Sequence, residues 1–195
     1  MIPLIIGSIG FLCYFTYDIN SITKQNRFLQ KGFLIGTFLV AAASVGMLVT
    51  GWKNINWESG LVWACLLFGI VMFGLLIYTL FFALPFESTY VEENKQRLAY
   101  TEGVYALCRH PGVLWYGGMY LCMAGMIRTQ QSVVQAAVFI LWNIAYVILQ
   151  DKIIFPRTFT NYGDYKRTAP FLLPNKRSMK RCLETGKFRK KGGRA

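Results

Sequence analysis

Long apolar runs are the strongest constraint on the fold of this 195-residue chain. A bilayer core about 30 Å thick is crossed by roughly twenty residues of α-helix at 1.5 Å per residue. A helix also satisfies its own backbone hydrogen bonds where no water can do so. We therefore predict an all-α integral membrane protein with five transmembrane helices. They are expected at residues 2–22, 32–51, 59–84, 113–127 and 133–149.

The composition agrees with a membrane protein. Hydrophobic residues make up 54% of the chain and charged residues only 15%, whereas about a quarter of the residues of a soluble domain are charged. The formal net charge is +12, and the positive residues gather in the C-terminal tail and in loops beside the apolar runs. Because each Lys or Arg near an anionic membrane surface gains about 1 kcal/mol, we expect membrane lipids, and no nucleic acid, as partners. The sequence leaves the oligomeric state open.

The positive residues also predict the orientation in the membrane. With five spans, the basic loop at residues 24–31, the polar connection at residues 86–109 and the C-terminal tail share one side. Thirteen Lys and Arg residues lie from Lys152 onward, whereas the opposite side has little beyond Lys53 and Arg128. Because positive loops mark the cytoplasmic side, we expect the N-terminus outside and the C-terminus in the cytoplasm.

The chain is predicted to form one membrane domain over residues 1–175, followed by a basic, mobile tail over residues 176–195. Residues 113–127 and 133–149 are joined by a short polar turn, which predicts a helical hairpin between the fourth and fifth spans. After them we expect an amphipathic segment along the membrane surface, broken at Pro156. Its apolar members are Ile153, Ile154, Phe155, Phe159 and Tyr162.

Residues 98–118 combine a charged loop with the start of an apolar helix. They contain the only histidine of the chain, His110, which lies between Arg109 and Pro111. A proline fixes its own φ and restricts the preceding residue to extended geometry. This predicts that His110 occupies a rigid turn at the boundary between water and lipid. No metal site is expected, because one histidine and five unclustered cysteines do not make the usual ligand sets.

Two sequence blocks resemble the isoprenylcysteine carboxyl methyltransferases. The first block, residues 103–111, contains Gly-Val-Tyr-Ala followed by Arg-His-Pro with the spacing of the family's G-V-Y-A-x-x-R-H-P signature. The second block, residues 159–174, is similar to the family's F-G-x-x-Y-x-x-Y pattern followed by two spaced prolines. It comprises Phe159, Tyr162, Gly163, Asp164, Tyr165, Pro170 and Pro174. The two blocks cover roughly the C-terminal half of the chain.

The resemblance implies a membrane-embedded enzyme that transfers a methyl group from S-adenosylmethionine. The cofactor-side half is then residues 86–175, and its polar connection is the first candidate cofactor loop. By position in the motif, Arg109 complements the cofactor's carboxylate, Tyr105 offers a hydroxyl or ring face, and His110 contacts the amino acid end. The implied cofactor-binding residues are Arg97, Leu98, Ala99, Tyr100, Tyr105, Arg109, His110, Pro111, Gly112, Val113, Gln150 and Asp151.

Three departures from the family pattern bear on the chemistry. Val113 stands where the family has tyrosine, and Gln150-Asp151 stands where it has two glutamates. The third departure is Tyr146, at the place of the arginine that holds the substrate carboxylate. The hypothesis is that Arg157 or Arg167 replaces that charge, or that the acceptor is a different lipophilic molecule, because a buried carboxylate without a cation is costly.

Two other functions stay open from the sequence. Membrane sterol and steroid reductases, which use NADPH, end in similar Arg-His-Pro and spaced-tyrosine blocks. A non-catalytic membrane binding protein is the other alternative. The length of 195 residues favours the methyltransferase, because the reductases are usually longer and have more spans.

Overall fold

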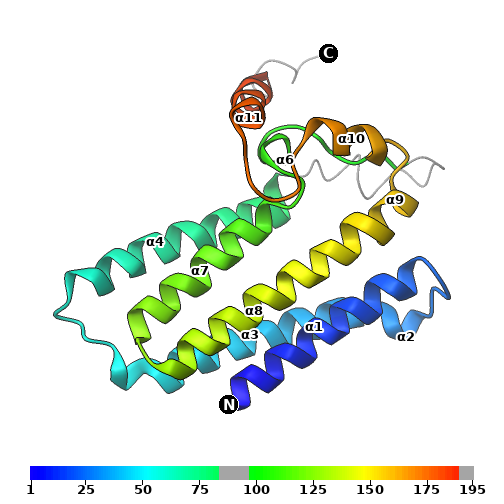
Figure 1. Cartoon of the computed structure of the whole chain (residues 1–195). Helices are drawn as coiled ribbons and strands as arrows, with labels where there is room; N and C mark the ends of the chain where they lie inside the picture. The colour runs from blue at the N-terminus through cyan, green and yellow to red at the C-terminus, as the bar shows by residue number, and fades with distance from the viewer. Residues whose placement is uncertain (84–96, 189–195) are drawn as a thin grey trace. The chain divides into compact units, whose positions relative to one another are not determined.

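The computed structural model describes residues 1–83 and 97–188. Within these ranges every regular element is a helix and no strand is found (Figure 1). The predicted all-α class is therefore confirmed for the described part of the chain. Pro85, Glu87, Glu92 and Glu93 of the polar connection lie outside the described residues, as do residues 189–195 of the tail.

Over residues 1–83 and 97–188, four helical stretches are long and apolar enough to cross a bilayer. Three of them are helix α1 (Ile2–Ser21), helix α3 with its short extensions (Arg27–Asn54), and helix α4 with a π-helical end (Gly60–Phe82). The fourth contains helix α8 and runs over Gln130–Thr158. These stretches support a multi-pass membrane protein.

Helix α7 (Pro111–Ile127) corresponds to the predicted fourth span. Its 17 residues rise about 26 Å at 1.5 Å per residue, which is shorter than a typical hydrocarbon core. The structure therefore confirms a helix at this place, whereas the count of five spans stays a prediction.

The chain divides into two compact units, and each is described here by itself. Unit 1 comprises Met1–Phe73 and Tyr116–Ile154, and unit 2 comprises Gly74–Trp115 and Phe155–Ala195. The boundaries between the units fall within helices α4 (Gly60–Ile77) and α7, and each unit has its own core.

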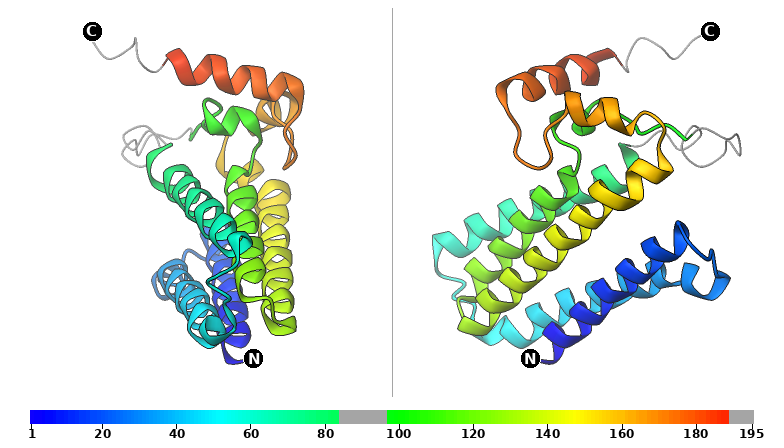
Figure 2. Two further views of the ribbon diagram at one scale, coloured as in Figure 1. Left: turned by 90° about the vertical axis from the view of Figure 1, so that its left-hand side faces the viewer. Right: turned by 45° about the vertical axis from the view of Figure 1, so that its right-hand side comes forward.

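Helices α1 and α3 (Gly32–Gly51) form the closest helix pair of unit 1, as Figures 1 and 2 show from three directions. A Cβ atom at Gly36 would lie 2.7 Å from the Gly10 carbonyl oxygen, and one at Gly10 would lie 2.9 Å from that of Gly36. Larger residues at either position would push the two backbones apart. Gly10 and Gly36 therefore permit the close contact of the two helices.

Aromatic side chains fill the rest of the unit 1 core. Phe11 of α1 stacks on Trp142 with ring centroids 6.2 Å apart and meets Phe139 at 6.3 Å. Tyr120 of α7 packs edge-on against Phe139 at 5.3 Å and hydrogen-bonds to the Ser44 hydroxyl. These residues tie α1, α3 and α7 to helix α8 (Gln130–Leu149).

Helix α8 starts at a reciprocal cap in which Thr129 and Ser132 bond to each other's backbone N–H at 3.2 and 3.1 Å. The helix continues through a π-helical segment, η3 (Gln150–Ile154), into helix α9 (Phe155–Thr158). The predicted break at Pro156 is therefore wrong. A π segment rearranges the backbone hydrogen bonds just before the proline, which lets the helical path pass it.

The described residues of unit 2 also form helices α6 (Val104–Leu107), α10 (Tyr162–Thr168) and α11 (Lys176–Phe188). Its core is a cluster of Tyr162, Tyr165 and Ala169, with Ala99, Tyr105, Phe155 and Phe159 packed around it. Phe155, Phe159 and Tyr162 were expected along the membrane surface. Tyr162 is instead only 2% exposed, and the two phenylalanines pack against it, because they share this aromatic cluster.

Helix α11 differs from the expected mobile tail. The segment from Lys176 is rich in positive charge, yet thirteen of its residues form a regular helix. The side chain of Asn175 accepts a hydrogen bond from the Ser178 backbone N–H at 2.9 Å, and the Ser178 hydroxyl accepts one from the Asn175 N–H at 3.0 Å. This cap fixes the start of the helix.

Candidate functional site

The two sequence blocks are joined in unit 2 by Arg109. Its backbone N–H donates to the Pro170 carbonyl at 2.9 Å. One guanidinium nitrogen donates to the carbonyl oxygens of Ala169 at 2.7 Å and Lys166 at 3.4 Å, and the guanidinium lies over the Phe171 ring at 5.7 Å. A permanent cation at the C-terminal carbonyls of α10 is well placed to stabilise that helix end.

Tyr105 and Tyr165 make the second connection between the blocks. The buried Tyr165 hydroxyl donates to the Tyr105 carbonyl at 2.7 Å, and burial raises the pKa of Tyr165. The Tyr105 hydroxyl in turn donates to the Thr79 carbonyl at 3.1 Å. Thr79 belongs to the π-helical end of α4, η2 (Tyr78–Phe82), and its own hydroxyl accepts from the Trp115 indole N–H at 3.0 Å.

His110 lies between two aromatic rings, and only 7% of it is exposed. Its imidazole stacks on Phe155 with centroids 5.6 Å apart and an interplanar angle of 11°, and meets Phe171 edge-on at 5.3 Å. The His110 carbonyl accepts from the Val113 N–H at 3.1 Å, which begins α7 directly after Pro111. The rigid turn predicted for His110 is therefore present.

Gly103, the first residue of the first block, needs to be glycine because of its backbone. Its φ of 57° and ψ of −129° lie in a region that residues with a Cβ atom rarely adopt. Its N–H donates to the Thr185 hydroxyl of α11 at 2.9 Å. Among the described residues, no atom lies within 4 Å of where a Cβ would be, so the backbone here borders open space in this part of the structure.

Residues Arg97 to Tyr100 lie along the start of the second block. The Asn161 side chain pairs with both backbone groups of Ala99, accepting from its N–H at 2.7 Å and donating to its carbonyl at 3.0 Å. The Thr160 N–H donates to the Arg97 carbonyl at 3.1 Å. Arg97 and Leu98 are exposed, whereas the ring of Tyr100 contacts Tyr105 edge-on at 6.1 Å.

Cys108 is an inert thiol within the first block. It is fully buried, and burial raises its pKa to about 11, although a hydrogen bond with the His110 backbone acts in the opposite direction. A thiol with so high a pKa is almost entirely protonated at neutral pH and is therefore a poor nucleophile. The first block thus offers its imidazole, guanidinium and phenol, but no reactive cysteine.

The other proposed site residues belong to unit 1. The Gln150 amide donates to the Asp18 carboxylate at 2.9 Å, and the Tyr146 hydroxyl also bonds to that carboxylate. The Tyr146 ring stacks on Tyr14 at 5.4 Å. Asp151 is buried next to Gln150. Tyr146, proposed for the substrate, and Gln150, proposed for the cofactor, therefore both contact an acidic partner within this unit.

Arg157 and Arg167 were expected to replace the positive charge that the resembled family has at the position of Tyr146. Both lie on the surface of unit 2. Arg167 is exposed and pairs with the exposed Asp164 on the same helix at 3.7 Å. Arg157 of α9 is exposed as well. Gly112 and Val113 form the first turn of α7, where Val113 is buried and a Cβ on Gly112 would meet only Leu76, at 3.7 Å.

Sequence reasoning missed four residues that hold this arrangement together. Asn161, Thr79 and Thr185 act through hydrogen bonds between segments distant in the chain, which no local pattern reveals. The fourth, Asp18, carried a usable signal. It is an acidic residue within an apolar run, and such residues commonly mark functional sites in membrane proteins.

Comparison with protein-family models, curated proteins and solved structures finds no match to this chain.

Proposed function

We propose that this chain is an integral membrane methyltransferase that uses S-adenosylmethionine and acts on a lipophilic acceptor at the cytoplasmic membrane face. One observation carries the proposal: the two family-like blocks, about fifty residues apart in the chain, pack against each other. Arg109 bonds to the carbonyl of Ala169, and Tyr165 bonds to the carbonyl of Tyr105. Blocks that form one cofactor site need such contacts.

The residues of unit 2 fit the chemical requirements of this cofactor. S-adenosylmethionine supplies a methyl group on a positively charged sulfur. Its carboxylate needs a donor, which exposed Arg97 provides, and its flat adenine needs an open face beside a peptide segment. We propose the segment at Gly103 and the exposed residue Leu98 for that face. The protein's main contribution is then to hold donor and acceptor in line, because correct positioning removes much of the barrier.

His110 is the proposed organiser of the cofactor's amino acid end. Its ring is fixed between Phe155 and Phe171, and its backbone begins α7. A side chain restricted by packing loses little further entropy when a ligand binds, which favours affinity. Gln150 and Asp151 belong to unit 1, and their part in cofactor binding stays a prediction from the resemblance, with Asp151 replacing the family's acidic pair.

The contacts of Tyr146 support an acceptor other than a prenylcysteine carboxylate. Tyr146 and Gln150 both bond to the Asp18 carboxylate. A second carboxylate bound beside Asp18 would be repelled by it, and its desolvation would cost several kcal/mol without a cation. We therefore propose a hydroxyl on a ring, or the polar head of an amphiphile, as the group that is methylated.

A transfer assay with radiolabelled S-adenosylmethionine tests this function. We expect the label to appear in long-chain phenols, hydroxypyrones or a membrane lipid extract, and to be low with N-acetyl-farnesylcysteine. Efficient turnover of the farnesylcysteine compound, undiminished in Arg157→Ala and Arg167→Ala, would contradict the proposed acceptor class. Absence of transfer to any acceptor, with intact cofactor binding, would favour a non-catalytic binding protein.

The proposed topology has five spans, with α7 as the short fourth one and a hairpin formed with α8. A span of this length is accommodated by local thinning of the bilayer at modest cost. Cysteines introduced singly at the exposed positions Lys31 and Lys176 are expected to label from the cytoplasm, and those at Asn54 and Gln130 from outside. Labelling of Asn54 and Lys176 from one side would rule out five spans.

A further inference from the structure

Helix α11 has one face fixed against the first block. Ser178, near its start, is only 1% exposed, and Thr185 two turns later accepts the N–H of Gly103 at 2.9 Å. Helix α11 lies beside α6 in unit 2 (Figure 1). Small and polar side chains therefore make this contact, which leaves the longer side chains of α11 for its other faces.

The opposite face of α11 exposes apolar residues next to cations. Met179 is 52% exposed and Leu183, one helical turn further, is 66% exposed. Leu173, just before the helix, is 78% exposed. The helix carries five Lys and Arg residues against one acid, Glu184. Exposed apolar side chains on a short basic helix are typical of helices that lie in a membrane interface.

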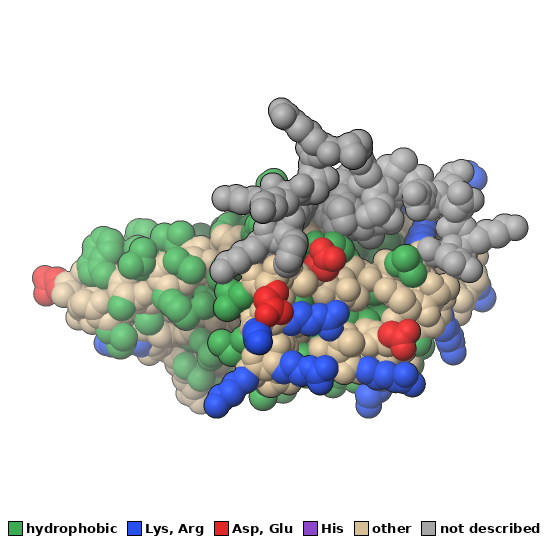
Figure 3. Space-filling view, turned by 90° about the horizontal axis from the view of Figure 1, so that it is seen from above, with side chains coloured by type: hydrophobic (Ala, Val, Ile, Leu, Met, Phe, Trp, Pro, Cys, Tyr) green, Lys and Arg blue, Asp and Glu red, His purple; other side chains and the backbone are tan. Residues whose placement is uncertain are grey.

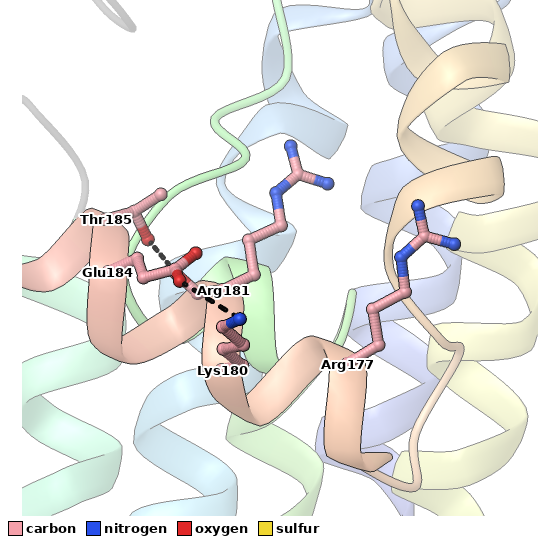
Figure 4. A pocket seen from close by; sticks show the side chains of 5 residues that line it. All are labelled: Arg177, Lys180, Arg181, Glu184 and Thr185. Carbon is pink, nitrogen blue, oxygen red and sulfur yellow. Dashed lines mark hydrogen bonds and ion pairs between the residues drawn. The ribbon is translucent and has the colours of Figure 1, made fainter.

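An open pocket of about 460 Å³ on α11 is lined by two arginines and a lysine. Figure 4 shows the Arg177 and Arg181 side chains, one turn apart, extending to the same side of the helix. Lys180 is paired with Glu184 at 3.9 Å. A pair of guanidinium groups suits a free anion, because each presents a planar fork of donors. At 3.6 residues per turn the two arginines lie about 160° round the helix from Met179 and Leu183, so this pocket is separate from the apolar face.

We propose that α11 docks on the surface of an anionic phospholipid bilayer, with Met179 and Leu183 inserted among the lipids and with Lys176 and Lys180, which border them on the helix, at the headgroups. Charge complementarity supports this occupant, because α11 carries five Lys and Arg residues against one acid. Figure 3 shows Lys and Arg side chains exposed on the surface seen from above. A nucleic acid or a free phosphate would explain the cations but would leave the two exposed apolar side chains unexplained.

Docking of α11 also acts on the first block. Because Thr185 holds the N–H of Gly103, a lipid that fixes α11 also fixes the backbone that leads to Tyr105 and His110. Anionic lipid is thus expected to order the candidate cofactor site. This role does not depend on which reaction the site performs.

Hydrogen exchange of the full chain in lipid nanodiscs tests the docking. We expect the amides of residues 176–186 to exchange at least about tenfold more slowly in discs with phosphatidylglycerol than in discs of phosphatidylcholine alone, since each cation near an anionic surface strengthens docking roughly fivefold. Lys176→Glu combined with Arg177→Glu should abolish the difference. Because glutamates in the first turn stabilise a helix, loss of the lipid-dependent protection in this variant cannot be ascribed to unfolding of α11.

Lys53→Glu is the matched control, because Lys53 is an exposed cation of unit 1, and it should keep the lipid dependence. Leu183→Ser should weaken the protection in anionic discs. Equal exchange of α11 in both lipids would overturn the proposal. Equal protection by inorganic phosphate in phosphatidylcholine discs would also overturn it, because the pocket would then bind free anions without the bilayer.

Discussion

Replacement of Arg109 by methionine separates a structural role from a ligand-binding role. Methionine keeps an apolar stem of similar reach but removes the bonds to Ala169 at 2.7 Å and Lys166 at 3.4 Å, together with the contact on Phe171. A hydrogen bond that involves a charged group contributes about 1.5–3 kcal/mol, and a cation–π contact about 0.5–1 kcal/mol. The 3.4 Å bond is too long to add much.

We therefore expect Arg109→Met to lower the free energy of unfolding by about 2–3 kcal/mol. This corresponds to a decrease of roughly 5–10 °C in the melting temperature of a chain of this size. The assay is thermal unfolding of the detergent-purified protein without ligand. Arg167→Met is the matched control, because Arg167 is exposed and paired only on the surface of α10, where such pairs contribute about 0–1 kcal/mol.

An unchanged melting temperature in Arg109→Met, with loss of cofactor binding, would refute this reasoning. Arg109 would then be a ligand of the cofactor carboxylate, as its position in the motif implies. Equal destabilisation by Arg109→Met and Arg167→Met would also refute it, since the two arginines would then contribute equally to stability.

Three other predictions follow from unit 2. His110→Phe should keep the melting temperature near that of the wild type, because a second aromatic ring fits between Phe155 and Phe171, and should weaken S-adenosylmethionine binding in a titration. Gly103→Ala should cost about 1–3 kcal/mol in a thermal unfolding assay, because its φ of 57° and ψ of −129° strain any residue with a Cβ. Cys108 has a pKa of about 11 in the folded chain against an ordinary 9.0, so stability should decrease as pH rises from about 9 to 11, by up to roughly 2 kcal/mol. A Cys108→Ala chain should show a flatter pH profile in the same unfolding measurements.

The apolar helices were largely predictable from the sequence. The predicted run at residues 32–51 coincides with α3 (Gly32–Gly51), and the run at residues 113–127 begins two residues inside α7 (Pro111–Ile127). Both are bounded by charged residues or by proline, which interrupt apolar helices. The π-helical end of α8 and the passage of Pro156 were not predictable, because they depend on backbone rearrangement and not on composition.

The tail was misjudged for a related reason. A segment with many lysines and arginines has the composition of a disordered chain, but Asn175 and Ser178 cap it and Thr185 holds it against Gly103. Capping adds about 1 kcal/mol. A single polar contact with a distant residue leaves no periodic pattern in the sequence, so α11 was missed.

The sequence predicted which residues belong to the candidate site, but not the contacts that these residues make. Pro111 after His110 predicted a rigid turn, which the structure has. The sequence did not predict that Arg109 bonds to the C-terminal end of α10. It also gave no sign that Asp18 accepts bonds from Gln150 and Tyr146. These contacts join residues more than fifty positions apart, and sequence spacing carries no information about them.

Calorimetric titration of the purified protein with S-adenosylmethionine, S-adenosylhomocysteine and NADPH tests the central claim most directly. We predict saturable binding of both sulfur compounds and none of NADPH, with the affinity for S-adenosylmethionine reduced in His110→Phe. A ligand at a hundred times its Kd should also raise the free energy of unfolding by about 2.7 kcal/mol, which gives an independent reading by thermal shift. Binding of NADPH without either sulfur compound would contradict the account and would assign the chain to the membrane reductases.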